Sequence, residues 1–184
     1  MEARLVDLGD LPEYPIMWDV GAFKGEWAKD ITERYPKSCI ELFEPVPDYA
    51  LSLDQKGFLV RPYGLSDHDH AATIKIAGDR SSTYDIPQDG QGKVEIQIKD
   101  VSAVLGDQKL DVMKINVEGA EYPIMERLLD TGQIYQVRTF LIQFHTFIPS
   151  FGERYLSIKK CMQHTHALQW RTPFVWERWD KVNL

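Results

Sequence analysis

The order of apolar and polar residues along the chain predicts strands that alternate with helices. Apolar runs of strand length occur at 16–20, 39–43, 58–63, 110–117 and 137–144. Apolar residues at helical spacing follow four of these runs, over 25–35, 48–56, 123–131 and 155–162. This alternation predicts a mostly parallel sheet with helices on both faces. Asp48 is expected to cap the second helix.

The segment between the third and fourth runs has a less regular pattern. Residues 64–70 contain two predicted turns, 72–77 is compatible with a strand, and 78–92 is rich in Gly, Ser, Asp and Pro. That composition predicts a mobile loop. Strict alternation over 94–98 then predicts a half-exposed strand, and 101–105 is expected to form a short helix.

The end of the chain predicts a C-terminal antiparallel hairpin, formed by 167–171 and 173–179. Its aromatic side chains are Trp170, Phe174, Trp176 and Trp179. Strand alternation places most of this cluster in the core of the hairpin. The alternative is an aromatic surface on which a sugar or a base stacks.

Composition and charge narrow the class of protein. The length of 184 residues fits one domain over 1–184, with residues 1–15 as a short lead-in. The formal net charge of −7 disfavours duplex nucleic acid as a partner, because such a protein needs a basic face. A polar N-terminus and the lack of an apolar run of about 18 residues predict a cytoplasmic protein without a membrane partner. Cys39 and Cys161 are far apart, so neither a zinc site nor a disulfide is predicted.

The first predicted strand leads into a glycine turn, in which Asp19, Gly21 and Gly25 have the spacing D-x-G-x-x-x-G. Such a turn places free N–H groups and the positive end of a helix dipole beside a ligand. Glu44 ends the second strand, where a carboxylate can accept hydrogen bonds from the hydroxyls of a nucleoside ribose. Phe23 replaces the middle glycine of a dinucleotide-binding turn, which argues against a dinucleotide. An ordinary turn whose glycines only pack the helix is the alternative.

Three polar residues at the carboxyl end of the fourth strand form a second candidate site. Lys114, Asn116 and Glu118 alternate with apolar residues, so we expect them to share one face of the strand. Ligands of open α/β sheets bind at this end of the strands. The alternative is a structural ion pair between Lys114 and Glu118.

His145 ends the next strand, which we expect to neighbour the strand of Glu118. A histidine that titrates near neutrality can accept the proton of an attacking hydroxyl group. A structural histidine with satisfied hydrogen bonds is an equal alternative.

Four segments, in this order along the chain, carry a resemblance to a known family: 19–22 (D-V-G-A), 43–47 (F-E-P-V-P), 64–67 (G-L-S-D) and 114–121 (K-I-N-V-E-G-A-E). With them the chain resembles the FkbM family of S-adenosylmethionine-dependent methyltransferases over roughly residues 16–145. The resemblance implies the Rossmann-like class I methyltransferase fold, with a mostly parallel seven-stranded sheet. It also implies S-adenosylmethionine as cofactor and, for most of the family, O-methylation of sugars and other small hydroxyl compounds.

The resemblance assigns the cofactor side to the residues that match its motifs: Asp19, Gly21, Ala22, Phe23, Gly25, Glu44, Pro45, Ser66, Asp67 and Asn116. Ala22 and Phe23 would contribute backbone groups, while Ser66 and Asp67 would lie near the adenine. For Asp67, a plain turn former is the alternative. Catalysis on the acceptor side is expected from Glu118, His145 and Lys114.

Two residues depart from the family pattern. Asn116 stands where the family usually has Asp, and Gln143 stands near where the following strand often has Glu. Both changes remove a carboxylate from the acceptor side. The acid that would anchor a divalent metal is therefore missing, and no metal site is predicted.

These observations together predict an S-adenosylmethionine-dependent O-methyltransferase that acts on a small-molecule acceptor such as a sugar. N-methylation is one alternative, and a degenerate nucleoside-binding module without catalysis is another. Little of the chain remains for an acceptor-binding cap. Either the loop 78–92 or a second subunit of a homo-oligomer is therefore expected to close the site.

Overall fold

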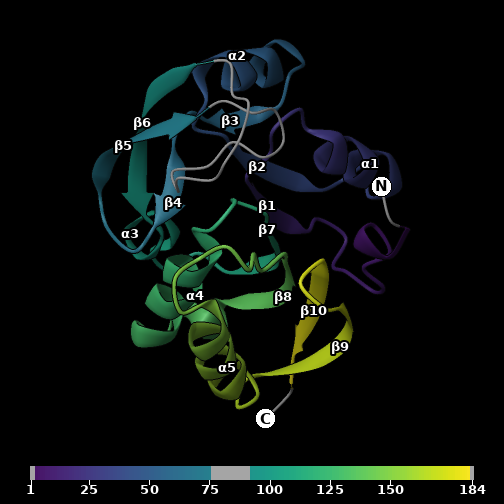
Figure 1. Cartoon of the computed structure of the whole chain (residues 1–184). Coiled ribbons are helices and arrows are strands. Elements are labelled where there is room, and N and C mark those ends of the chain that lie inside the picture. Colours follow the sequence, from purple (N-terminus) through teal and green to yellow (C-terminus); the bar gives the residue numbers. More distant parts are fainter. Residues whose placement is uncertain (1–2, 76–91, 183–184) are drawn as a thin grey trace.

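The computed structural model describes residues 3–75 and 92–182, so the predicted mobile loop 78–92 lies outside the described residues except for Gly92. Seven strands form the main sheet, in the order β3-β2-β1-β7-β8-β10-β9 (Figure 1). Their bounds are β1 Ile16–Val20, β2 Cys39–Phe43, β3 Leu59–Arg61, β7 Leu110–Ile115, β8 Val137–Ile142, β9 His166–Thr172 and β10 Trp176–Lys181. The five strands β3, β2, β1, β7 and β8 run parallel to one another, and β10 is antiparallel to both of its neighbours, β8 and β9. The predicted parallel sheet and C-terminal hairpin are therefore confirmed.

Helices cover both faces of this sheet. Their bounds are α1 Glu26–Arg34, α2 Pro47–Gln55, α3 Val101–Leu105, α4 Glu121–Asp130 and α5 Phe151–Met162, with short 3-10 turns at Ala3–Leu5 and Gln133–Gln136. Successive strand residues point to opposite faces. Met17 and Val112 therefore pack with α1 and α2, whereas Trp18 and Met113 pack with α3, α4 and α5.

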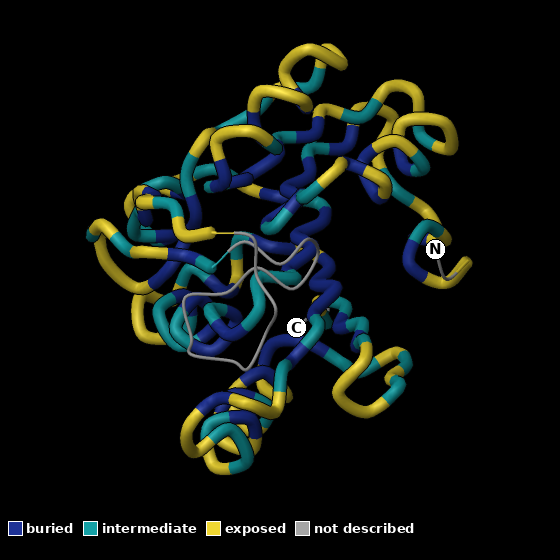
Figure 2. The backbone as a smooth tube through the Cα atoms, turned by 45° about the horizontal axis from the view of Figure 1, so that its top comes forward, coloured by how far each residue is buried: buried dark blue, intermediate teal, exposed yellow. Residues whose placement is uncertain are grey.

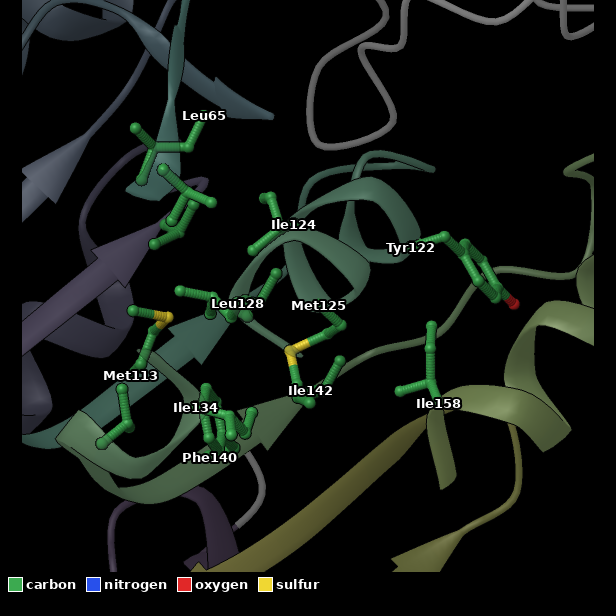
Figure 3. Packing of buried hydrophobic residues seen from close by; sticks show 14 of the residues in the cluster. Leu65, Met113, Tyr122, Ile124, Met125, Leu128, Ile134, Phe140, Ile142 and Ile158 are labelled. Atoms are coloured by element: carbon green, nitrogen blue, oxygen red, sulfur yellow. The ribbon is translucent and has the colours of Figure 1, made fainter. Parts of the chain in front are cut away.

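The larger of the two cores lies under α4 and α5. Figure 3 shows Met113, Phe140 and Ile142 from the strands packed against apolar side chains of α4, with Ile158 of α5 at the side. Figure 2 shows buried backbone concentrated along the central strands and exposed residues on the outer turns. This buried sheet is the rigid base on which the carboxyl ends of β1, β2 and β7 are held.

A second, three-stranded sheet was not foreseen from the sequence. It consists of β4 Gly64–Ser66, β5 His70–Lys75 and β6 Lys93–Asp100 in the order β4-β6-β5, and it packs beside α2 (Figure 1). The prediction of a turn at 64–67 is therefore wrong, because 64–66 pairs in parallel with the end of β6. Gly64 fits this pairing, since a Cβ there would lie 2.7 Å from Ile98 Cδ1.

Two further local predictions are wrong. Helix α2 begins at Pro47, and Asp48 lies inside its first turn rather than capping it. Proline suits this first position because its missing N–H would have no helical partner. Strand β7 ends at Ile115, and Glu118 has a left-handed backbone with φ 51°. Glu118 therefore does not continue the strand alternation that was expected to align it with Lys114.

The aromatic residues of the terminal hairpin are only partly buried. Trp179 is buried, Trp170 and Trp176 are half-buried, and Phe174 is 40% exposed. The prediction that most of this cluster forms hairpin core is correct for Trp179 alone. Among the helices that the structure describes, none has the length and apolar character needed to cross a membrane.

Candidate cofactor and acceptor site

A pocket of about 710 Å³ opens over the carboxyl ends of β1, β2 and β7. The topological switch point of the sheet lies between the neighbouring strands β1 and β7, where the strand order reverses. Ligands of open α/β sheets usually bind at this point. All the residues predicted to form the site line this pocket except Asp19, Gly25 and His145. The structure therefore brings both candidate sites, from distant parts of the sequence, into one cavity.

The glycine turn is held tightly between β2 and the end of β7. The N–H groups of Gly21 and Ala22 both donate to the carbonyl oxygen of Phe43, at 3.0 and 3.2 Å. Gly21 has φ +81°, and a Cβ at this position would lie 1.9 Å from the carbonyl oxygen of Asn116. Only glycine permits this backbone conformation and this close approach.

Gly25 has a packing role rather than a place in the pocket wall. It precedes α1 with φ +77°, and a Cβ there would lie 2.6 Å from Leu53 Cδ2 of α2. The second glycine of the motif therefore allows α1 and α2 to approach each other.

Glu44 joins the glycine turn to the start of α2. Its Oε2 accepts the N–H of Phe23 and its Oε1 accepts the N–H of Val46, both at 2.8 Å. The side chain is buried at the pocket wall, and burial raises its pKa to about 7 although the two backbone hydrogen bonds oppose this rise. Each carboxylate oxygen retains a lone pair for a ligand hydroxyl.

Lys114 and Asp19 form a buried ion pair behind this turn. Lys114 Nζ lies 2.7 Å from Asp19 Oδ1 and also donates to the carbonyl oxygen of Gly21 at 2.8 Å. Burial raises the pKa of Asp19, and Lys114 opposes that rise. The alternative of a Lys114–Glu118 ion pair is wrong, because the Lys114 ammonium is directed at the glycine turn.

Glu118 pairs instead with His145, which lies between two carboxylates. His145 Nε2 is 3.1 Å from Glu118 Oε1, and His145 Nδ1 is 3.0 Å from Glu121 Oε1. Burial lowers the pKa of His145, but the two carboxylates outweigh it and raise the pKa to about 9. The prediction that His145 titrates near neutrality is therefore wrong, because a pKa of about 9 favours the protonated imidazole at pH 7.

Glu121 is a site residue that the sequence analysis missed. It is fully buried at the start of α4 and accepts hydrogen bonds from the N–H groups of Gly119 and His145, at 2.8 and 2.7 Å. The only signal in the sequence is the second acid of the segment E-G-A-E, three residues after Glu118.

Asn116 lines the pocket, and its side chain carries a buried acceptor atom. Its Oδ1 is buried and has no hydrogen-bond partner among the residues that the structure describes. A buried carbonyl oxygen without a partner is costly. This atom is therefore suited to a donor group of a bound ligand.

The far wall of the pocket is formed by the small second sheet and by the residues between β4 and β5. Ser66 Oγ donates to Asp67 Oδ1 at 3.2 Å, and His68 Nδ1 lies 2.8 Å from the same oxygen. The other lining residues from this region are Gly64 and Leu65 of β4, His70 and Ile74 of β5, and Ile96 and Ile98 of β6. No sequence pattern identified the residues of β5 and β6, because the pairing of β5 with β6 brings them together.

The opposite end of the pocket, next to Glu118, carries both polar and aromatic groups. It is lined by Gln143 after β8, Arg154 of α5, and Val175 and Trp176 at the tip of the terminal hairpin. Among the described residues, no group of three or more His, Cys, Asp or Glu side chains is placed to hold a metal ion.

The strand order, the single antiparallel strand β10 and the position of the pocket define a class I methyltransferase fold. The sequence matches the methyltransferase FkbM domain over residues 19–172, and the chain belongs to this family. The family membership supports a methyltransferase activity.

Solved structures agree with this assignment of the fold. The methyltransferase FkbM from Methylobacillus flagellatus KT is similar with a TM-score of 0.61 and 12% identity, over 94% of this chain and 45% of that chain. The precorrin-6y C5,15-methyltransferase from Geobacter metallireducens GS-15 is similar with a TM-score of 0.51 and 12% identity, over 97% of this chain and 87% of that chain. At such identities the likeness is one of fold alone, and this chain spans less than half of the M. flagellatus protein. A comparison with curated proteins finds no significant match.

Proposed function

We propose that this protein is an S-adenosylmethionine-dependent methyltransferase that methylates a hydroxyl group of a small acceptor such as a sugar. The observation that carries the proposal is that one pocket contains Glu44 with the glycine turn at one end and Glu118 at the other. A cofactor and an acceptor bound in this pocket would be neighbours, as group transfer requires.

The residues of the cofactor end suit S-adenosylmethionine. Glu44 would accept hydrogen bonds from the ribose hydroxyls, and Ile96 and Ile98 of β6 offer an apolar surface to the adenine. The buried Oδ1 of Asn116 would accept a hydrogen bond from the α-ammonium group. When bound, the cofactor supplies an activated methyl group on a sulfonium centre.

Glu118 is the proposed general base on the acceptor side. His145 holds the Glu118 carboxylate at the pocket wall, because His145 Nε2 lies 3.1 Å from Glu118 Oε1. Glu118 would accept the proton of the acceptor hydroxyl as the methyl group is transferred. His145, which carries its proton at pH 7, would not itself be the base.

Trp176 and Gln143 suit a sugar-like acceptor. The indole of Trp176 is half-buried at the pocket wall, and such a ring can pack against the C–H groups of a sugar ring. The amide of Gln143 can both donate to and accept from hydroxyl groups.

Calorimetry and a transfer assay would test the proposal together. We expect S-adenosylhomocysteine to bind and NAD not to bind, because Phe23 replaces the glycine that a pyrophosphate requires. Transfer would be followed by mass spectrometry with S-adenosylmethionine and a panel of hydroxylated and amine acceptors. Glu118→Gln should lower turnover by about 10²–10⁴ with unchanged cofactor affinity, whereas Glu33→Gln on the exposed side of α1 should not.

Each alternative function predicts a different result. Transfer to amines alone, with little effect of Glu118→Gln, would favour N-methylation, since an uncharged amine needs no strong base. Binding of S-adenosylhomocysteine without transfer to any acceptor would favour a nucleoside-binding module. Tight binding of NAD without binding of S-adenosylhomocysteine would overturn the proposal.

A further inference from the structure

The carboxylate of Glu121 connects two segments that flank the proposed acceptor site. Its Oε2 accepts the N–H of Gly119, in the turn after β7, at 2.8 Å. Its Oε1 accepts both the main-chain N–H of His145 at 2.7 Å and the ring Nδ1–H of the same residue at 3.0 Å. The side chain is fully buried and does not line the pocket, so it would not touch a bound acceptor.

These contacts determine where the imidazole of His145 points. The two main-chain donors hold the Glu121 carboxylate in place, and that carboxylate then holds Nδ1. Nε2, on the other side of the ring, is thereby directed at Glu118 Oε1. The turn supports this arrangement, because Glu118 and Gly119 have positive φ angles of 51° and 116° and fold the chain back toward His145.

The contacts also determine the charge of the ring. A neutral imidazole has only one N–H, whereas both ring nitrogens of His145 face a carboxylate oxygen, so the protonated ring satisfies both contacts. The other described groups around His145 make contacts away from its two ring nitrogens. Tyr122 donates its hydroxyl to the main-chain carbonyl of His145, Arg154 lies 5.2 Å over the Tyr122 ring, and the Phe147 ring packs at 5.2 Å.

We propose that Glu121 is a positioning residue for methyl transfer, which keeps His145 protonated and aims its Nε2 at the Glu118 carboxylate. This inference rests on the proposed function only in assigning Glu118 as the base. Glu121 acts on His145 whether or not an acceptor is bound, so its effect can be measured in the protein alone.

NMR titration of the histidine ring protons tests the first part. In Glu121→Gln we expect the pKa of His145 to fall by about one to two pH units, because a neutral amide replaces a carboxylate at Nδ1. Glu177→Gln is the matched control: Glu177 is equally buried, accepts hydrogen bonds from Tyr155 and Trp179, and does not contact His145. His166, a buried histidine bonded to the carbonyl of Val137, serves as an internal reference in the same spectra.

The pH profile of turnover tests the link to Glu118. In the unmodified protein, turnover should fall above about pH 9 as His145 loses its proton. In Glu121→Gln this alkaline limb should move to lower pH by the same amount as the His145 pKa. A structural role for Glu121 would lower the amount of folded protein without moving the limb.

Three results would overturn the proposal: an unchanged His145 pKa in folded Glu121→Gln, an unmoved alkaline limb despite a lowered pKa, or a neutral His145 in the unmodified protein at pH 7.5. The last measurement uses ring ¹⁵N shifts and needs no variant, so it decides the matter even if Glu121→Gln does not fold. If the unmodified protein transfers no methyl group, the proposed function fails, and the histidine titration alone decides whether Glu121 controls His145.

Discussion

Lys114 Nζ lies 2.7 Å from Asp19 Oδ1, and the two side chains are only 7% and 0% exposed. The pair joins β7 to β1 directly behind the glycine turn, and Lys114 also donates to the carbonyl oxygen of Gly21. Lys114 therefore supports the turn, and this contact gives the lysine of the K-I-N-V-E-G-A-E segment a structural role apart from catalysis.

Removing one partner of this pair should be strongly destabilising. Lys114→Met leaves the Asp19 carboxylate buried without a counter-charge, and we expect the free energy of unfolding to fall by about 3–5 kcal/mol. The double variant Lys114→Met with Asp19→Asn removes both charges and should regain part of this loss. Urea unfolding at pH 7.5 measures both effects, and a loss below about 1 kcal/mol for the single variant would contradict the prediction.

Replacing Gly21 with alanine should destabilise the protein much more than the same replacement at Gly57, a second glycine with a similar backbone conformation. Gly57 has φ +85° with nothing within 4 Å of an added Cβ, so Gly57→Ala isolates the backbone strain, about 1 kcal/mol. Gly21→Ala adds a Cβ that would meet the carbonyl oxygen of Asn116, and overpacking adds about 1–3 kcal/mol. Thermal unfolding compares the two variants, and equal losses would show that close approach at Gly21 is unimportant.

The main sheet could be predicted from the sequence because each of its parallel strands is a compact apolar run. Strand β1 over Ile16–Val20 and β2 over Cys39–Phe43 have the predicted bounds. The positions of Glu44 and Gly21 at the pocket followed from these runs, since they stand directly at the carboxyl ends. Local pattern was sufficient wherever a strand is buried on both faces.

Features that depend on contacts between distant segments could not be predicted. Strand β4 consists of Gly64–Ser66, and it becomes a strand only through pairing with β6 more than thirty positions later. The chain reverses at Glu118 in a left-handed conformation that side-chain alternation does not reveal. The raised pKa of His145 requires Glu118 and Glu121 on both sides of one ring, which depends on how β7, α4 and β8 are packed.

The folded protein should lose stability at alkaline pH, because deprotonation of His145 removes a stabilising contribution. Its pKa is raised from 6.5 to about 9, so its stabilising contribution is fully present below pH 6.5 and is lost as the pH rises through 9. Between pH 7.5 and 9.5 we expect the free energy of unfolding to fall by about 2 kcal/mol through this residue. The Glu44 carboxyl, with a pKa of about 7, is largely ionised throughout this window.

His145→Gln provides the comparison. The variant should be less stable than the unmodified protein at pH 7.5, and the difference should shrink by about 2 kcal/mol at pH 9.5. Urea unfolding at the two pH values measures this change. Parallel pH profiles for the two proteins would mean that His145 does not carry its proton near neutrality.

Replacement of Asn116 should weaken the binding of ligands that carry an amino-acid group and leave the binding of those that lack it unchanged. S-adenosylhomocysteine carries an α-ammonium group, whereas 5′-methylthioadenosine shares its nucleoside and sulfur but lacks that group. Asn116→Ala removes the buried Oδ1, and we expect it to weaken binding of S-adenosylhomocysteine by about 1.5–3 kcal/mol, as for a hydrogen bond to a charged group. Binding of 5′-methylthioadenosine should hardly change.

Glu44→Ala is the matched control at the other end of the same ligand. Because both ligands contain the ribose, this variant should weaken both by a similar amount, about 1.5–3 kcal/mol. Asn116→Asp should retain or improve binding of S-adenosylhomocysteine, since a carboxylate also accepts from an ammonium group. Calorimetry with the two ligands and three variants separates the contacts. Equal weakening of both ligands by Asn116→Ala would place Asn116 near the nucleoside or in the structure of the turn, and would remove it from the amino-acid end.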